Sequence, residues 1–166
     1  VGGLVGEYQG EVGTGFWTGF AWQDTPPNAI TNSYVNGGTV TSLGGSDVGG
    51  LVGLNNKGIV DASHVDGVNV TGLRNVGGLV GTDSGEGWSQ IGVVSNSHAL
   101  NSTVSGSQNV GGLVGFAGSS WTSNGGLNAV LISNSYVSGG TVNAVATISA
   151  DAVGGLVGWL GDFTID

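Results

Sequence analysis

The chain has 166 residues, of which 36 are glycine and none is cysteine or methionine, and its net charge is −9 with Lys57 and Arg74 as the two cations. Without cysteine there is no disulfide framework and no thiolate metal site, and without clustered Lys and Arg the chain is not expected to bind nucleic acid or anionic membranes. No apolar run reaches the ~18 residues of a membrane span, no Gly-X-Y period indicates collagen, and the near absence of proline argues against a disordered linker.

The chain opens on a six-residue block, Val-Gly-Gly-Leu-Val-Gly, that occurs five times without change. The copies are Val1–Gly6, Val48–Gly53, Val76–Gly81, Val110–Gly115 and Val153–Gly158. A verbatim block that returns every few tens of residues indicates a repeat architecture.

A second block follows the first in each unit, and its four copies align without a gap. They start at Ile30, Val60, Val94 and Ile132 and end at Val40, Val70, Val104 and Val142. The chain is therefore one repeat domain over 1–166, with approximate units 1–47, 48–75, 76–109, 110–152 and a half unit 153–166.

Fixed blocks joined by connectors of variable length are typical of a β-solenoid, in which each coil pairs with the coils above and below it. No window carries a helical apolar stripe, and glycine interrupts every candidate helix. The sequence therefore predicts an all-β fold, a parallel β-helix of about five coils whose insertions leave from one corner. The aligned aliphatic residues are expected to form a continuous interior, and the column Ser33, Ser63, Ser97 and Ser135 a tight corner or an inward hydroxyl ladder.

One column of the second block indicates a turn, because its members are Gly37, Gly67, Asn101 and Gly139. Glycine is free to adopt positive φ, and asparagine tolerates the left-handed region better than other side chains. We expect a left-handed residue here in every coil. After the turn, the alternation Thr39-Val40-Thr41 predicts the valine inside and the threonines outside.

The six-residue block poses a problem, because Leu51 and Val52 cannot both face one side of a flat strand. Either the Gly-Gly pair bends the chain and resets the alternation, or the strand is covered on both faces. Tryptophans in the connectors offer such a cover, so the sequence favours the covered strand.

The blocks resemble the GLUG repeat of bacterial secreted and surface proteins, whose core is glycine, leucine, an apolar residue and glycine, as in Gly50–Gly53. The resemblance covers nearly the whole chain apart from the long connectors. It implies an extracellular repeat scaffold of the adhesin type and lends no catalytic residue. The sequence also shows no His-Glu-x-x-His, nucleophile elbow or nucleotide-binding loop, so no enzymatic activity and no cofactor are expected.

The two histidines, His64 and His98, share a column with Tyr34 and Tyr136. With Asp66 they are weak candidates for a metal site, since histidine and carboxylate bind zinc or copper. The alternative, which the sequence favours, is an outward ladder of stacked rings and no metal. Asp83 and Glu86 share a glycine-rich connector and suggest at most one weak calcium site.

Aromatic residues gather in the connectors and are the candidates for contact with a ligand or a partner. The set is Tyr8, Phe16, Trp17, Phe20, Trp22, Trp88 and Trp121. Such residues stack on sugar rings or anchor a protein partner, but they equally clad a core.

The predicted function is that of an extracellular or cell-surface structural and adhesion protein. Its expected partner is itself, by head-to-tail stacking into a filament, or the neighbouring repeats of a longer chain, because open solenoid ends carry unpaired strand edges. The alternatives are an adhesin module that binds glycan or protein through its tryptophan-bearing connectors and, more remotely, an ice-binding solenoid that uses the outward threonines.

Overall fold

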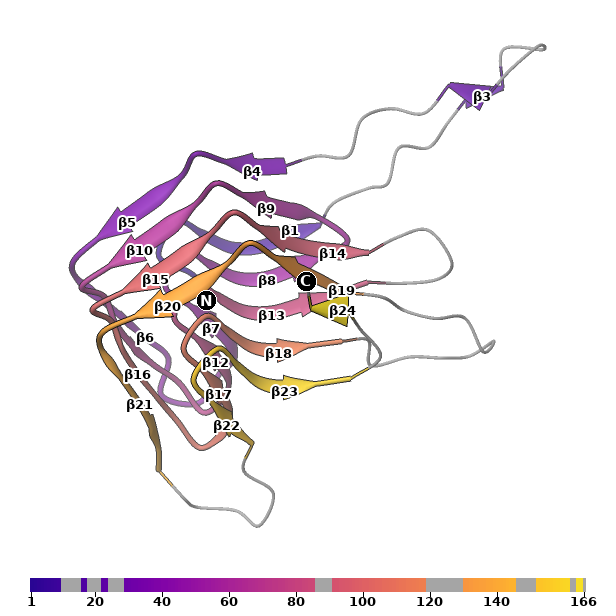
Figure 1. Ribbon diagram of the computed structural model, residues 1–166. Helices are drawn as coiled ribbons and strands as arrows, with labels where there is room; N and C mark the ends of the chain where they lie inside the picture. Colours follow the sequence, from indigo (N-terminus) through magenta and orange to yellow (C-terminus); the bar gives the residue numbers. More distant parts are fainter. Residues whose placement is uncertain are drawn as a thin grey trace.

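The computed structural model describes residues 1–9, 16–17, 22–23, 29–85, 91–118, 130–145, 152–161 and 164–165, and these residues form strands and turns with no helix. Apart from one antiparallel hairpin, every strand runs parallel to its counterpart one repeat away. The chain thus winds into a parallel β-solenoid, as predicted from the repeat (Figure 1).

A full coil contains five short strands. In the second coil these are β8 (Val52–Asn56), β9 (Ile59–Asp61), β10 (His64–Asp66), β11 (Asn69–Thr71) and β12 (Arg74–Gly77). The first coil consists of β1 (Val5–Gln9), β4 (Ala29–Thr31), β5 (Tyr34–Asn36), β6 (Thr39–Thr41) and β7 (Ser46–Gly49), with the hairpin β2 (Phe16–Trp17) and β3 (Trp22–Gln23) inserted after β1.

The third and fourth coils repeat this order, and a partial fifth coil follows. The third has β13 (Val80–Ser84), β14 (Gly92–Ser95), β15 (His98–Leu100), β16 (Thr103–Gly106) and β17 (Gln108–Gly111). The fourth has β18 (Val114–Ala117), β19 (Val130–Ser133), β20 (Tyr136–Ser138), β21 (Thr141–Ala144) and β22 (Val153–Gly154), and the fifth has β23 (Val157–Leu160) and β24 (Thr164–Ile165).

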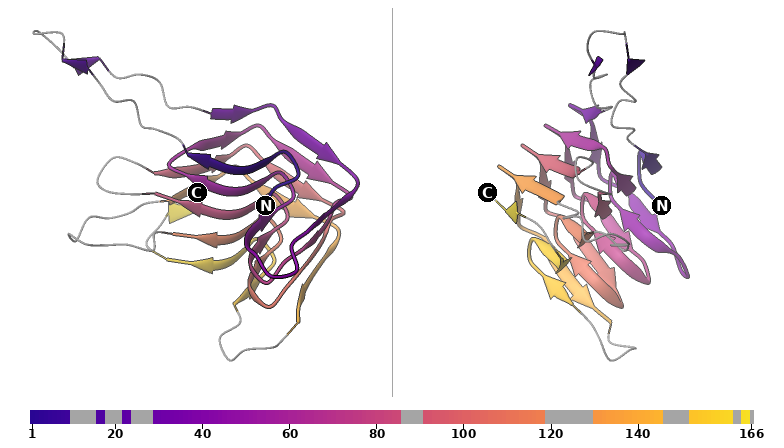
Figure 2. Two further views of the ribbon diagram at one scale, coloured as in Figure 1. Left: turned by 180° about the vertical axis from the view of Figure 1, so that it is seen from behind. Right: turned by 90° about the vertical axis from the view of Figure 1, so that its right-hand side faces the viewer.

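Equivalent strands of successive coils form five sheets that run along the stack (Figure 2). Their register is the one that the aligned blocks predict: His64 pairs with Tyr34 and His98, and Val70 pairs with Val40 and Val104. The second block alternates in and out, since Val40 is buried between exposed Thr39 and Thr41.

The interior consists of columns of aliphatic side chains, about six to a coil. In the second coil, from β8 to β12, the buried set is Val52, Val60, Val65, Val68, Val70 and Val76, each with 0% exposure. Most columns repeat an aliphatic residue from coil to coil, as Val40, Val70 and Val104 do. Burial of this apolar surface is the main source of stability.

The six-residue block is bent rather than covered. Strand β7 ends at Gly49, the chain bends at Gly50 and Leu51, and β8 starts at Val52. Val48, Leu51 and Val52 therefore reach the same core from two segments of different direction. The expectation of a single strand covered by connector tryptophans was wrong, because the glycine pair resets the alternation.

The predicted turn column is confirmed, with φ of +68° at Gly37, +64° at Gly67, +48° at Asn101 and +69° at Gly139. A second left-handed column, five residues earlier in each coil, was not predicted. Its members and φ values are Asn32 (49°), Ala62 (47°), Asn96 (49°) and Asn134 (46°). The two turns separate the strands of each second block, which have three or four residues.

The serine column that follows this second turn is the predicted hydroxyl ladder. The hydroxyl of Ser63 donates to the carbonyl of Asp61 (2.8 Å) and accepts the backbone N–H of Ser33 in the coil above (3.2 Å). Ser97 and Ser135 repeat both bonds, so each buried corner is satisfied by a side chain that also ties two coils together.

Long connectors leave mainly from one corner, as predicted. Residues 10–28, 85–91 and 118–129 all join the first strand of a coil to the second. A fourth connector, residues 145–152, leaves from another corner, between β21 and β22, where the earlier coils have short turns.

Candidate functional site

The two end coils expose residue types that the inner coils bury. Leucines of the six-residue block occupy one column, and Leu51, Leu79 and Leu113 have 0% exposure whereas Leu4, in the first coil, is 54% exposed. The strands of the first and last coils are also the edges of their sheets. Within the described residues, each end of the solenoid is therefore a face with apolar side chains and unpaired backbone groups, the kind of edge that pairs with a further strand.

The glycines of the six-residue block show what kind of structure can pack on the two end faces. A Cβ at Gly50 would lie 2.1 Å from the carbonyl oxygen of Gly78 in the next coil, and a Cβ at Gly78 would lie 2.0 Å from that of Gly112. The glycine column thus exists because the backbone of the next coil passes directly over it. Gly155 continues the column in the last coil, and its Cβ would meet no atom within 4 Å.

A second glycine column faces the opposite direction. A Cβ at Gly53 would lie 2.4 Å from the carbonyl oxygen of Gly6, and a Cβ at Gly81 would lie 2.5 Å from that of Gly53. Gly6, in the first coil, has nothing within 4 Å of the same position. The two ends are therefore complementary: one presents Gly155 and the other presents Gly6, each with the space that a coil of the same kind fills elsewhere.

The end face at the fourth coil is also hollow. A cavity of about 550 Å³ opens there and is lined by apolar side chains of the interior columns and by the glycine edge, including Ala99, Val137, Val142, Gly155 and Leu156. The corresponding space between inner coils is filled by the next layer of valine and leucine. The apolar part of this lining belongs to the columns that a further coil covers elsewhere in the solenoid.

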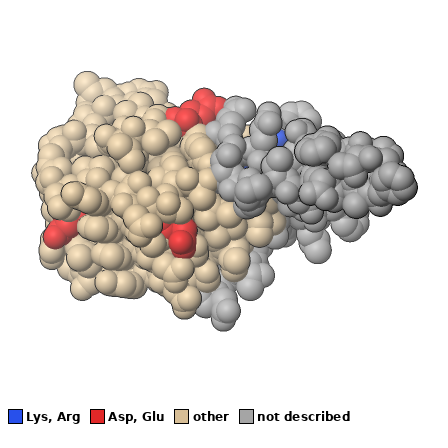
Figure 3. Space-filling model, turned by 90° about the horizontal axis from the view of Figure 1, so that it is seen from above, with Lys and Arg blue, Asp and Glu red and all other residues tan. Residues whose placement is uncertain are grey.

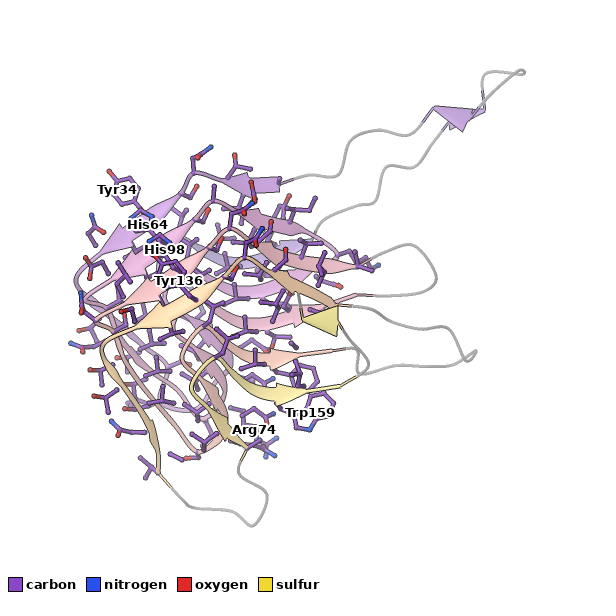
Figure 4. All side chains as sticks on the ribbon, in the orientation of Figure 1. Tyr34, His64, Arg74, His98, Tyr136 and Trp159 are labelled. Carbon is purple, nitrogen blue, oxygen red and sulfur yellow. The ribbon has the colours of Figure 1, made fainter. Side chains whose placement is uncertain are left out.

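The ring ladder at Tyr34, His64, His98 and Tyr136 is present on the outside of the β5–β10–β15–β20 sheet (Figure 4). Adjacent rings are stacked at 5.3, 4.9 and 4.9 Å between centroids, with interplanar angles of 11°, 5° and 10°. The tyrosines at the two ends are 60% and 51% exposed. The faces of the inner rings are thus largely covered by their neighbours. The outer faces of the two terminal tyrosines remain exposed.

This geometry does not form a metal site. Two nitrogens bound to one zinc ion lie at most about 4 Å apart, whereas the ring centroids of His64 and His98 are 4.9 Å apart in a parallel stack. The described residues contain no group of three His, Asp or Glu side chains that could hold a metal ion. The carboxylate of Asp66 instead accepts a hydrogen bond from Asn101 Nδ2 at 2.9 Å.

Histidine in the ladder is sensitive to its surroundings. Burial, the charge of His64 and, in the opposite direction, the charge of Asp66 together lower the pKa of His98. The uncharged ring is therefore favoured in the stack, where a second imidazole lies 4.9 Å away.

The outward threonine face lies on the β6–β11–β16–β21 sheet. Its two columns are mixed, with Thr39, Asn69, Thr103 and Thr141 in one and Thr41, Thr71, Ser105 and Asn143 in the other. The face is polar and regular along the stack, but it is not a uniform Thr-x-Thr array.

Asp83 lies inside the solenoid rather than in a connector. It is the penultimate residue of β13 and has 0% exposure. Its Oδ1 accepts a hydrogen bond of 2.6 Å from Asn55 Nδ2, which also donates to the carbonyl of Gly58. Burial raises the pKa of Asp83 to about 8, and the Asn55 hydrogen bond opposes this rise. A calcium site shared with Glu86 is thus not supported for Asp83, since its carboxyl faces the interior; Glu86 lies outside the described residues.

Of the aromatic candidates, Tyr8 is half-buried against the core, in one column with Asn55 and Asp83, and burial raises its pKa. Phe16, Trp17 and Trp22 lie in the β2–β3 hairpin, where Trp17 pairs with Trp22, and their side chains are outside the described part of the chain. Phe20, Trp88 and Trp121 are also outside it. Sequence reasoning missed Trp159, which stacks on Phe116 at 4.5 Å and 4° and is 39% exposed.

Charge is sparse on the solenoid. In the view of Figure 3 the acidic side chains are separate groups on a mostly uncharged surface. Among the described residues no helix has the length and apolar character required to cross a membrane.

Comparison with known proteins gives one partial similarity. A protein of Evansella cellulosilytica named "Putative Gly-rich membrane protein" is 38% identical over 63 residues, which are 37% of this chain and 7% of that protein. The chain thus spans a small fraction of the length of this relative. No protein-family model matches the chain. No solved structure matches it either.

Proposed function

We propose that this chain is a GLUG-type structural segment of an extracellular or cell-surface protein, and that its role is to build a stiff rod by adding coil to coil. The observation that carries the proposal is the pair of complementary ends. Gly155 and Gly6 keep the open space that the next backbone occupies at every inner glycine of their columns. The occupant that fits both faces is a further coil with the same six-residue block.

The surface location rests on composition and on likeness. The lack of cysteine and methionine suits an oxidising exterior. The partial relative, named as a membrane protein, is much longer than its matched part and is consistent with a repeat segment within a larger surface protein. Protease treatment of intact cells of the source organism tests this: digestion of the segment supports a surface location, and complete protection contradicts it.

The stacking is tested by a glycine series. The purified chain should associate head to tail as its concentration rises, as measured by sedimentation velocity and seen as rods by electron microscopy. Gly155→Ala should abolish this association without changing the circular-dichroism spectrum or the melting temperature, because the added methyl group meets no atom of its own chain. Gly44→Ala is the matched control, since Gly44 also has nothing within 4 Å.

A second experiment adds a coil within the same chain instead of relying on a second copy. Duplicating residues 76–109 within the chain should raise the melting temperature, because one more inner coil is formed. The proposal is wrong if the duplicated chain is no more stable and the wild-type chain stays monomeric at every concentration.

A further inference from the structure

A polar groove runs along the outside of the solenoid and is separate from the end faces. It lies where the β7–β12–β17–β22 sheet meets the β1–β8–β13–β18–β23 sheet, and it has a volume of about 550 Å³. Its lining residues come from four successive coils, including Asp47, Asn75 and Asn109 on one wall and Leu54, Thr82 and Phe116 on the other.

The first wall carries a fixed chain of hydrogen bonds. Asn109 Nδ2 donates to Asn75 Oδ1 at 2.8 Å, and Asn75 Nδ2 donates to Asp47 Oδ1 at 2.9 Å. The hydroxyl of Thr82, from the opposite wall, donates to the same carboxylate oxygen. All three wall residues hold left-handed backbone conformations, with φ of 60°, 50° and 53° in chain order. The polar atoms are thus held in place before any ligand arrives, which reduces the entropy cost of binding.

Arg74 stands at the rim of this wall, in one column with Ser46 and Gln108. It is exposed, and within the described part of the chain its guanidinium has no hydrogen-bond or ion-pair partner. It therefore offers five N–H donors to the groove in a chain of net charge −9.

The second wall supplies an apolar surface with a fixed position. Phe116 is in the lining, and Trp159 of the next coil stacks against it at 4.5 Å with 4° between the planes. Figure 4 shows Arg74 and Trp159 on the same side of the molecule, and their strands β12 and β23 are in contact.

We propose that this groove binds an extended chain of neutral sugars. A sugar chain presents hydroxyl groups that both donate and accept at its edges and C–H groups on its faces. The groove offers the matching set: a polar side chain from each coil, about 4.8 Å apart, which together supply amides, one carboxylate and one guanidinium beside leucine and phenylalanine. The inference does not depend on whether the coils stack end to end.

Other ligand classes fit less well. The net charge of −9 repels polyanions over a long range, and one arginine does not form the basic cluster that nucleic acid requires. A peptide that binds by adding a strand needs an unpaired sheet edge. The middle strands that form most of this groove, β8, β12 and β13, are paired on both sides.

Isothermal titration calorimetry with four soluble hexasaccharides (cellohexaose, xylohexaose, mannohexaose and maltohexaose) tests the proposal on the full chain. At least one should bind, and Arg74→Ala and Gln108→Ala should each weaken binding about fivefold to tenfold by removing rim donors. Asn69→Ala, an exposed amide on the β6–β11–β16–β21 sheet, is the control and should bind as the wild type does. Circular dichroism confirms that each variant is folded.

Three outcomes would overturn the inference. One is the absence of binding by all four sugars at millimolar concentration, and another is tighter binding of polygalacturonate than of any neutral sugar. The third is binding that survives both rim substitutions but is lost in Trp88→Ala or Trp121→Ala, which would move the sugar to the connectors.

Discussion

Leu79 and Leu4 occupy the same column of the same solenoid, yet one is completely buried and the other is 54% exposed. Their neighbours in sequence are identical, since both belong to a Val-Gly-Gly-Leu-Val-Gly block. The difference lies only in whether a coil covers them on both sides. In a repeat fold the contribution of a residue is therefore set by its neighbouring coils as much as by its own sequence.

The largest expected effect comes from shortening these two leucines. Leu79→Ala should cost about 2–5 kcal/mol of unfolding free energy, because it leaves a cavity between two coils, whereas Leu4→Ala should cost less than about 1 kcal/mol. Urea denaturation of both variants measures the difference. If both variants lost the same unfolding free energy, Leu4 would be covered in solution. Repeating the denaturation at low protein concentration would show whether the cover is a second copy stacked on the end face.

Asp83 sharpens the same comparison, because its column runs from half-buried Tyr8 in the first coil to a fully buried carboxyl in the third. A carboxyl whose pKa rises from 3.8 to about 8 on folding binds a proton that the unfolded chain has lost. Its burial is therefore tolerated best below about pH 4, and stability should fall as the pH rises from about 4 to 8.

Asp83→Asn should remove this part of the pH dependence and stabilise the protein at pH 7 by about 2–4 kcal/mol, since an amide keeps the bond from Asn55 without a buried charge. Thermal melts of the wild type and the variant from pH 4 to 8 measure it. Parallel stability curves for the two proteins would contradict the assignment.

A smaller effect is expected at the second left-handed turn. Ala62 holds a φ of 47°, where the other three coils have asparagine. Ala62→Asn should stabilise the chain by about 0.5–1 kcal/mol, because alanine is strained there. Ala29→Asn, at an exposed strand position, is the control and should bring no gain in thermal or urea melts. A loss of stability in the Ala62 variant would show that the turn is set by something other than residue preference.

The smallest effect is expected in the ring ladder, whose inner members are histidine and whose exposed ends are tyrosine. Because the pKa of His98 is lowered in the folded state, its contribution to stability is complete above about pH 6.5 and is lost as the pH falls through its folded value. His98→Tyr should keep the stack and flatten this acid limb, in the opposite pH direction to Asp83→Asn. NMR titration of the two imidazoles checks it directly, and a pKa of His98 above 6.5 would contradict it.

The architecture and the register could be predicted from the sequence, because identical blocks stack on identical neighbours. The column that contains Ser63 and the column that contains Gly67 also predicted the corners. It failed where one block carries two roles. The Gly-Gly pair of the six-residue block permits close approach of the next coil, and it also bends the chain. The bend alone decides which way the side chains of Leu51 and Val52 face. Ala62 has no residue preference that reveals a left-handed turn, although Asn-Ser in the other copies was a usable signal.

The candidate surfaces were harder to predict. Asp83 was assigned to a connector because glycine and acidic residues follow it, and its burial depends on Asn55, 28 residues away. The groove depends on two sheets that meet across coils, so that Asp47 and Thr82, 35 residues apart, share one hydrogen bond. No local sequence pattern predicts a contact between two sheets of this kind.

The open glycines at Gly6 and Gly155 have a consequence for evolution. The upper face of each coil is complementary to the lower face of the next. The geometry therefore sets no preferred number of coils. A gene of this kind can lose or gain whole units by recombination between its near-identical copies, and each product still closes its core. The length of the solenoid then changes in steps of one coil, without any redesign of the residues that hold the coils together.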